Sequence, residues 1–289
     1  MRRGAGTFSE EAMLGVFASL RGVSRLAAFL ASLACCAGLV VVHRAFADAP
    51  LLSKADSIRV LTLGDSITAG VAAGGGAAEN GGYRGVLGEL LAQDGYRAVF
   101  VGTRYDYSAQ IENRAHDGWP GYVLRSFPAD PGPGQLYGSL TRQALQETRP
   151  DVVLLMAGTN DLLRLQRSVA GYTMPNILES MNLLLGEIFS DDPQVRVIVA
   201  PVVSSPRIAA ASIDAFNAGL VPIVERYARS GDRISLATAM EQAVPRDVEH
   251  FPDGIHPSSD GGYADVARAW VQAIEQVTAA STGDPVAKR

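Results

Sequence analysis

The stretch Arg59-Val60-Leu61-Thr62-Leu63-Gly64-Asp65-Ser66-Ile67-Thr68 decides the fold of this chain. The apolar run before Gly64 is short and centred on Val and Leu, which is typical of a strand buried on both faces of a parallel sheet. Gly64 allows a sharp turn where a side chain would clash. We therefore expect Ser66 at the carboxyl end of a strand, where open α/β sheets place their ligand sites. The same residues would also suit a simple strand-to-helix turn capped by Asp65 or Ser66.

Strand and helix patterns alternate after this stretch, which predicts an α/β fold with a parallel sheet of about five strands covered on both faces. The expected strands are 58–63, 97–101, 151–156, 195–203 and 233–236. The expected helices are 83–93, 135–147, 175–190, 210–229 and 260–279. Residues 103–134 show little periodicity, and a long irregular segment in a compact domain is usually functional. One domain over residues 55–280 is expected, followed by a loose tail at 281–289.

The N-terminal region has the features of an export signal. Residues 26–42 are an unbroken apolar run preceded by Arg21 and Arg25 and followed by Ala45-Phe46-Ala47. This pattern predicts a signal peptide over residues 1–47, cleaved after Ala47, and hence a secreted or periplasmic protein. Because a spanning helix needs about 20 apolar residues, an uncleaved membrane anchor with the domain facing outside is the alternative. Both cysteines lie within the apolar run, so no disulfide is expected in the mature domain.

The charge balance excludes some partners. The chain carries 25 basic and 30 acidic residues, a formal net charge of −5, and removal of the N-terminal segment would make it more acidic. We expect such an acidic protein not to bind nucleic acid or anionic lipid, so membrane contact is expected only through a retained anchor. The Gly-rich loop at 70–82 contains neither Gly-x-Gly-x-x-Gly nor Gly-Lys-Ser/Thr, and no cofactor is expected.

Ser66 has a candidate base and orienting carboxylate near the end of the chain. A serine hydroxyl is a weak nucleophile until a base takes its proton, and that base needs a third group to fix its tautomer. Asp253 precedes His256 by three residues, so one turn can place its carboxylate against Nδ1 and leave Nε2 to face Ser66. His250 beside Glu249 is the rival, but neighbours in sequence usually point apart. We therefore predict a Ser66–His256–Asp253 triad.

A tetrahedral intermediate also requires hydrogen-bond donors aimed at its oxyanion. The backbone N–H of Ser66 is one natural donor, and the side-chain amide of Asn160, which follows the third expected strand, is a second. Gly121 is the expected third donor because glycine permits close backbone approach. Each residue also has a simpler interpretation, Asn160 as a helix cap and Gly121 as part of a Pro-Gly turn.

Taken together, four segments resemble the four blocks of the GDSL-type, or SGNH, hydrolases, in the same order. They are Gly64-Asp65-Ser66-Ile67, Gly121, Gly158-x-Asn160-Asp161 and Asp253-x-x-His256. The resemblance implies a flavodoxin-like three-layer α/β/α sandwich. It also implies Ser66 as nucleophile, His256 as base and Asp253 as its orienting partner, with Gly121, Asn160 and the Ser66 amide forming the oxyanion hole.

Further segments are similar to the acetyl xylan esterase branch, carbohydrate esterase family three. They include Gly82-Tyr83-Arg84, His116-Asp117-Gly118-Trp119-Pro120-Gly121-Tyr122 and Asp253-Gly254-Ile255-His256-Pro257. The chain departs from that branch with Asp117 where Glu is usual and Tyr122 where Trp is usual. The resemblance implies a serine esterase that removes small acyl groups, most simply acetyl, from a carbohydrate. Asp65, Trp119 and Tyr122 are the expected substrate contacts, although the two aromatic residues would also suit packing against the sheet.

Other functions fit the residues less well. Lipase, lysophospholipase and thioesterase-like relatives share the four blocks and would act on longer acyl chains. A metal-dependent hydrolase would have to draw its metal ligands from a few side chains scattered along the chain, so no metal site is expected. The candidate ligands are Asp65, Asp161, Asp253, His116 and His256. The Gly-x-Ser-x-Gly elbow of lipase-fold enzymes does not occur in the chain. A non-catalytic carbohydrate-binding protein would be expected if one triad member were missing.

Overall fold

The computed structural model describes residues 56–107, 111–112, 114–130, 132, 134–259 and 261–282. These described residues belong to one compact unit. The predicted signal peptide or anchor at 1–47 lies outside them, as do residues 283–289 of the predicted tail, so export stays a prediction. Residues 281 and 282, which were expected in the tail, form the end of the last helix. Within the described part of the chain, no helix has both the length and the apolar character needed to cross a bilayer.

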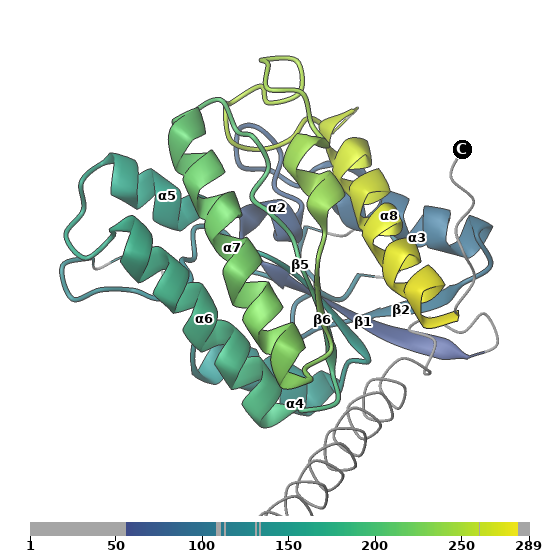
Figure 1. Cartoon of the computed structure of the whole chain (residues 1–289). Helices are drawn as coiled ribbons and strands as arrows, with labels where there is room; N and C mark the ends of the chain where they lie inside the picture. Colours follow the sequence, from purple (N-terminus) through teal and green to yellow (C-terminus); the bar gives the residue numbers. More distant parts are fainter. Residues whose placement is uncertain are drawn as a thin grey trace, which may run out of the picture. The chain divides into compact units, whose positions relative to one another are not determined.

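A parallel sheet lies at the centre of the fold, as the alternating pattern predicts (Figure 1). Its strands are β1 (Ser57–Gly64), β2 (Arg97–Val101), β4 (Val152–Met156), β5 (Arg196–Val199) and β6 (Ile234–Leu236). They are arranged in the order β2-β1-β4-β5-β6 and all pair in parallel. A two-residue strand, β3 (Asp117–Gly118), pairs with the end of β1 and was not expected from the sequence. β1 therefore has neighbours on both sides at the edge where Ser66 follows.

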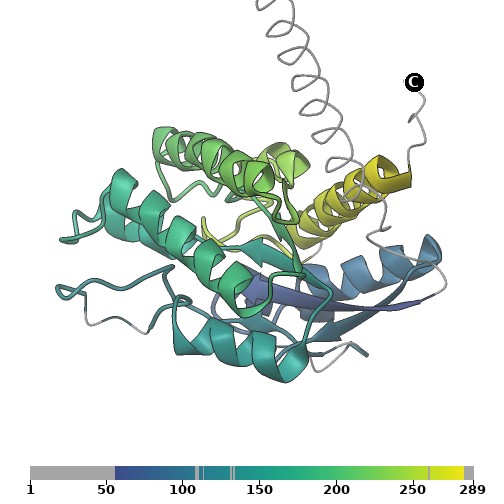
Figure 2. The same cartoon turned by 60° about the horizontal axis from the view of Figure 1, so that its bottom comes forward.

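Helices cover both faces of the sheet, which gives three layers (Figure 2). One face carries α3 (Tyr83–Gln93) and α8 (Gly262–Thr282), which pack against each other. The other carries α4 (Ser139–Thr148), α6 (Met174–Asp191) and α7 (Ala210–Ser230). The remaining helices are short: α2 (Ser66–Ala69), α5 (Thr159–Gln166), and the 3₁₀ turns η1 (Glu79–Gly81) and η2 (Thr238–Gln242).

The sequence of β1 explains its central position. Val60, Leu61 and Leu63 are at most 1% exposed, which confirms the prediction of a strand buried on both faces. Leu61 and Leu63 join the apolar core beneath α4, α6 and α7, whereas Val60 joins the core beneath α3 and α8. Since successive side chains of a strand point to opposite faces, one apolar run supplies both cores.

Two predicted boundaries differ from the structure for local reasons. Helix α4 begins at Ser139, not near 135, because Gln135 forms a bridge with Val123. Strand β5 ends at Val199, not at 203. The side chain of Asn217 on α7 accepts a hydrogen bond from Val202 N at 2.9 Å and donates one to Val202 O at 3.1 Å, so it replaces the strand partners that these groups would need.

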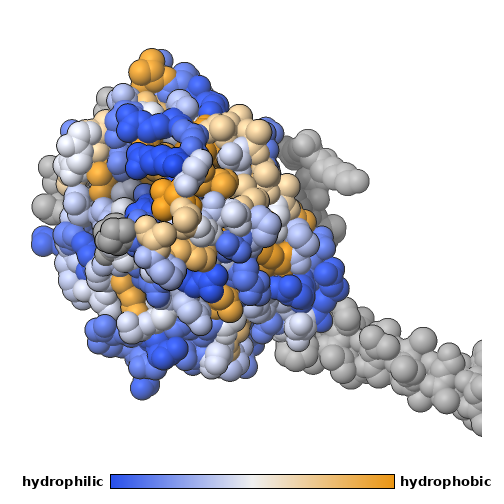
Figure 3. Space-filling view, turned by 90° about the vertical axis from the view of Figure 1, so that its left-hand side faces the viewer, coloured by the Kyte–Doolittle hydropathy of each residue, from blue (hydrophilic) through white to orange (hydrophobic). Residues whose placement is uncertain are grey.

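The outer faces of the helices are mixed in character. Figure 3 shows one face of the molecule, on which hydrophilic residues surround scattered hydrophobic ones. Scattered apolar side chains of this kind are ordinary on protein surfaces and mark no particular site.

The turn at Gly64 has no room for a side chain. A Cβ atom there would lie 2.1 Å from the carbonyl oxygen of Met156 in β4 and 2.4 Å from Thr68 Oγ1. We expect Gly64→Ala to lower the free energy of unfolding by about 1–3 kcal/mol, because overpacking forces the backbone to shift. Urea unfolding measures the change. Gly76→Ala is the control, since a Cβ there has nothing within 4 Å. Equal unfolding midpoints for the two variants would contradict this account.

Candidate active site

Ser66 is the first residue of α2 and directly follows β1. Asp65 caps this helix, because its Oδ1 accepts a hydrogen bond from Ile67 N at 3.0 Å. At the other end, the buried guanidinium of Arg84 donates to the carbonyl oxygens of Thr68 at 3.1 Å and Ala69 at 3.0 Å. The short helix is thus fixed at both ends, which holds Ser66 in one position.

The structure brings the three predicted triad residues together. His256 Nε2 lies 2.9 Å from Ser66 Oγ, across 190 residues of sequence. His256 Nδ1 lies 2.7 Å from Asp253 Oδ2. A neutral imidazole satisfies both contacts when Nδ1–H donates to the carboxylate and Nε2 accepts from the serine hydroxyl. The rival His250 pairs instead with Asp247, at 2.7 Å.

The loop that carries Asp253 keeps its carboxylate ionised. Burial alone would raise the pKa of Asp253, but hydrogen bonds from the His256 side chain and from two backbone N–H groups outweigh it and hold the pKa below its usual value. Those backbone donors are His256 N at 2.8 Å and Ile255 N at 2.9 Å, both to Oδ1. An ionised carboxylate at Nδ1 selects the tautomer that leaves Nε2 free to accept a proton.

The predicted oxyanion residues lie at the same edge of the sheet. Asn160 is the second residue of α5, which follows β4, and β4 pairs with β1 so that Met156 lies opposite Gly64. One N–H of the Asn160 amide donates to Tyr122 O at 2.9 Å, which leaves the second N–H available. Gly121 precedes Tyr122 and has φ 81°, in the left-handed region that favours glycine.

Buried polar groups hold the loop that contains Gly121. Trp119 N donates to Gly64 O at 2.9 Å and so ties the loop to the end of β1. His116 is buried, and its ring contacts Asp106 O at 2.8 Å through Nε2 and accepts from Gly118 N at 3.0 Å through Nδ1. Burial, followed by the charge of Arg84, lowers the pKa of His116 to about 4, so the ring is neutral. Its role is therefore to support the loop.

Two other aspartates near the site are buried. Asp65 is 1% exposed, its carboxylate caps α2 inside the protein, and burial raises its pKa, while its expected contact with substrate stays a prediction. Asp161 is fully buried, and both of its oxygens lie near Leu124 N, at 3.0 and 3.2 Å. Burial raises the pKa of Asp161 to about 8. This anchoring role was not predicted, although a carboxylate in the first turn of the helix after a buried strand was the available signal.

The remaining predicted residues, Trp119 and Tyr122, form an aromatic pair. Trp119 and Tyr122 are partly buried, with ring centroids 5.2 Å apart, and the guanidinium of Arg104 lies 4.2 Å from the Trp119 centroid. Both rings also pack against the core, so their contact with substrate stays a prediction. Among the described residues, no group of three or more His, Cys, Asp or Glu side chains is arranged to hold a metal ion.

Comparison with known proteins identifies the family. Residues 62–264 match the GDSL-like Lipase/Acylhydrolase family. The chain belongs to this family. The predicted resemblance is thereby confirmed, and with it the α/β sandwich fold. A multidomain esterase of Ruminococcus flavefaciens is 29% identical over 253 residues, which cover 82% of this chain and 31% of the relative. A putative endoglucanase X of Acetivibrio thermocellus is 28% identical over 139 residues, covering 48% of this chain and 56% of the relative.

This chain therefore spans about a third of the length of the first relative and just over half of the length of the second. Similar solved structures include a family 3 carbohydrate esterase of Clostridium thermocellum, with 26% identity and a TM-score of 0.61 over 78% of this chain and 98% of that one. A family 3 carbohydrate esterase of Talaromyces cellulolyticus shares the fold. It is 22% identical, with a TM-score of 0.57 over 76% of this chain and 99% of that one.

The buried carboxyl of Asp161 should make stability depend on pH. Its pKa is raised from 3.8 to about 8, so the unfolded chain releases this proton near pH 4 while the folded chain keeps it until about pH 8. The free energy of unfolding of the wild type, relative to Asp161→Asn, should therefore fall as the pH rises from about 4 to about 8, and then level off. Urea unfolding of both proteins over this range measures the difference. A difference that is constant with pH would contradict the prediction.

Proposed function

We propose that this protein is a serine esterase that hydrolyses short acyl esters, above all acetyl esters of carbohydrates. The observation that carries the proposal is the chain of two hydrogen bonds from Ser66 through His256 to Asp253, at 2.9 and 2.7 Å. A serine with a base and an oriented third group has the arrangement that nucleophilic catalysis requires. Membership of an acylhydrolase family supports the same reaction class.

The reaction follows from the positions of these atoms. Ser66 Oγ attacks the ester carbonyl carbon while His256 Nε2 takes the hydroxyl proton, and Asp253 stabilises the imidazolium that forms. The oxyanion accepts hydrogen bonds from the N–H of Ser66, the free N–H of Asn160 and the N–H of Gly121. The imidazolium then gives its proton to the leaving alcohol, and an acyl-enzyme remains. Water, deprotonated by His256, attacks this ester and releases the acid and the serine.

The choice of a carbohydrate acetyl ester rests on two further observations. The relatives with similar structures are named as carbohydrate esterases, and the one at 26% identity covers most of this chain. Beside Gly121 lies an aromatic wall of Trp119 and Tyr122, with Arg104 stacked on it. Aromatic faces bordered by polar groups suit sugar rings better than a long acyl chain. The alternative is a lipase-like enzyme for longer acyl chains, and its only support is that the family's description includes lipases as well as acylhydrolases.

Replacing the nucleophile tests the mechanism. We expect Ser66→Ala to reduce kcat for p-nitrophenyl acetate by at least about a thousandfold, because the attacking oxygen is lost while binding groups remain. Circular dichroism should show an unchanged fold. Ser57→Ala, at the start of the strand that precedes Ser66, is the matched control and should keep full activity. Turnover by Ser66→Ala at the wild-type rate would remove this serine from the mechanism.

The acyl group is tested by a series of substrates. We expect kcat/KM to fall from acetyl through butyryl to octanoyl p-nitrophenyl esters, and acetate to be released from acetylated xylan. A preference for the octanoyl ester would support the lipase-like alternative instead. If the folded protein hydrolyses none of these esters, a non-catalytic carbohydrate-binding role becomes the better interpretation.

A further inference from the structure

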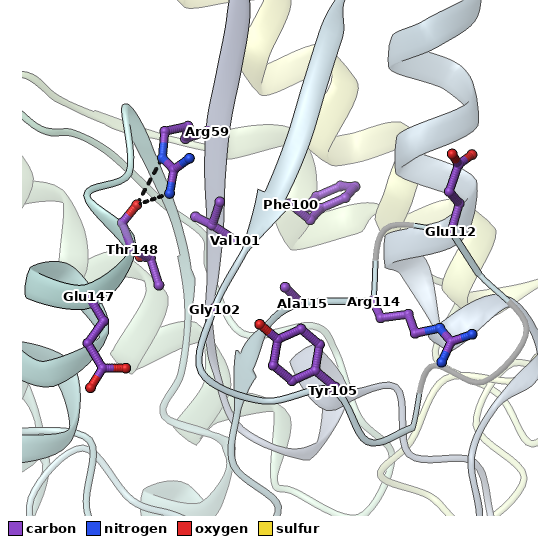
Figure 4. A pocket seen from close by; sticks show the side chains of 10 residues that line it. All are labelled: Arg59, Phe100, Val101, Gly102, Tyr105, Glu112, Arg114, Ala115, Glu147 and Thr148. Atoms are coloured by element: carbon purple, nitrogen blue, oxygen red, sulfur yellow. Dashed lines mark hydrogen bonds between the residues drawn. The ribbon is translucent and has the colours of Figure 1, made fainter.

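A groove of about 500 Å³ lies beside the edge strand β2, and no triad residue lines it (Figure 4). Its lining includes Val101 and Gly102 at the end of β2. The last turn of α4, with Glu147 and Thr148, lies on one side, and the loop after β2, with Tyr105, lies on the other. A volume of this size is in the range of small-molecule binding sites, roughly 300–1,000 Å³.

Tyr105 gives the groove an aromatic surface. Its ring lies across the groove between Gly102 and Ala115 in Figure 4, with the hydroxyl directed toward β2. Tyr105 is 65% exposed, and the other large exposed hydrophobic side chains among the described residues are valines. One of them, Val99 on β2, is 42% exposed and shares a strand face with Val101. An exposed ring next to open space can stack on a flat apolar face such as that of a sugar.

The charged side chains of the groove balance each other. Glu112 and Glu147 provide carboxylates, and Arg59 and Arg114 provide guanidinium groups. Arg59 is held in place, because its Nε and Nη2 donate to Thr148 O at 2.9 and 2.6 Å (Figure 4). Carboxylates accept hydrogen bonds and guanidinium groups donate them, so the lining can bind hydroxyl groups both as donors and as acceptors. A ligand with many hydroxyl groups and no charge fits this balance better than an ion.

Hydrogen bonds and ring contacts join the loop beside the groove to the loop that contains Gly121. Trp119 and Tyr122 lie on either side of Gly121 in the sequence, their tilted rings have centroids 5.2 Å apart, and Arg104 lies over Trp119. The backbone of Arg104 pairs with His116 through two hydrogen bonds of 3.0 Å, and Tyr105 is the next residue. The segment Arg104-Tyr105 therefore connects the aromatic pair beside the predicted oxyanion glycine to the groove.

We propose that this groove binds the uncharged sugar units next to the acylated residue of a polysaccharide, with Tyr105 stacking on one of the rings. The inference rests on the proposed carbohydrate esterase function and extends it: the substrate is a polymer held at two places on the protein. The ester carbonyl lies at Ser66, and the neighbouring sugar units lie along β2.

Binding tests the groove without catalysis. The full chain carrying Ser66→Ala is titrated calorimetrically with unsubstituted xylohexaose and with cellohexaose, and we expect at least one of them to bind. Adding Tyr105→Ala should weaken this binding about five- to tenfold, as the loss of an aromatic stacking contact does, whereas Tyr105→Phe keeps the ring and the affinity. Glu147→Ala, on the opposite wall, should also weaken binding. Tyr137→Ala, in the separate groove between α4 and α6, is the matched control and should not.

Kinetics gives a second readout. In the otherwise wild-type chain, Tyr105→Ala should lower kcat/KM for acetylated xylan about five- to tenfold more than it lowers kcat/KM for p-nitrophenyl acetate. Absence of binding to both hexaoses, or equal binding by the Tyr105→Ala variant, would overturn the groove proposal even if acetate release from xylan is intact. Failure of the esterase proposal is a different result, in which the wild type releases no acetate. The calorimetric comparison of the variants then still shows whether the groove binds the hexaoses.

Discussion

The site depends on the close approach of two backbones where β1 ends beside β4. At Gly64 a single added carbon would overlap the Met156 carbonyl, so the chain can turn there only because no side chain is present. This turn places Ser66 at the start of α2, while the neighbouring strand leads to Asn160 at the start of α5. The parallel sheet thus delivers groups from distant parts of the chain to one edge, as open α/β folds generally do.

Four aspartates near this edge differ because their surroundings differ. Asp253 is partly exposed and receives hydrogen bonds that favour its charged form, which suits it to orient an imidazole. Asp161 is fully buried, and its neutral form is favoured, which suits it to hold the backbone at Leu124. Burial also raises the pKa values of Asp65 and Asp117, and each of them holds nearby backbone N–H groups. Environment therefore separates the ionised carboxylate that contacts His256 from three buried ones whose pKa values are raised.

Much of the fold could be predicted because long periodic segments and short apolar runs are strong signals. The strand at 97–101 and the helix at 83–93 match the structure at both ends. β3 is too short to show any periodicity and so was missed, and the equally short α2 was expected only as the alternative of a strand-to-helix turn capped by Asp65 or Ser66. In the site, the three-residue spacing of Asp253 and His256 predicted their contact. The burial of Asp65 and Arg84 was not predictable, since such side chains are mostly exposed and only their tertiary partners reveal the exception.

The 190-residue separation between Ser66 and His256 has a consequence for how this protein comes into being. Contacts so distant along the chain form late, because the entropy of closing a long loop must be overcome first. During synthesis Ser66 is made 190 residues before its partner His256, which precedes the segment that forms α8. The Ser66 hydroxyl of the nascent polypeptide therefore lacks its imidazole partner until synthesis has passed residue 256.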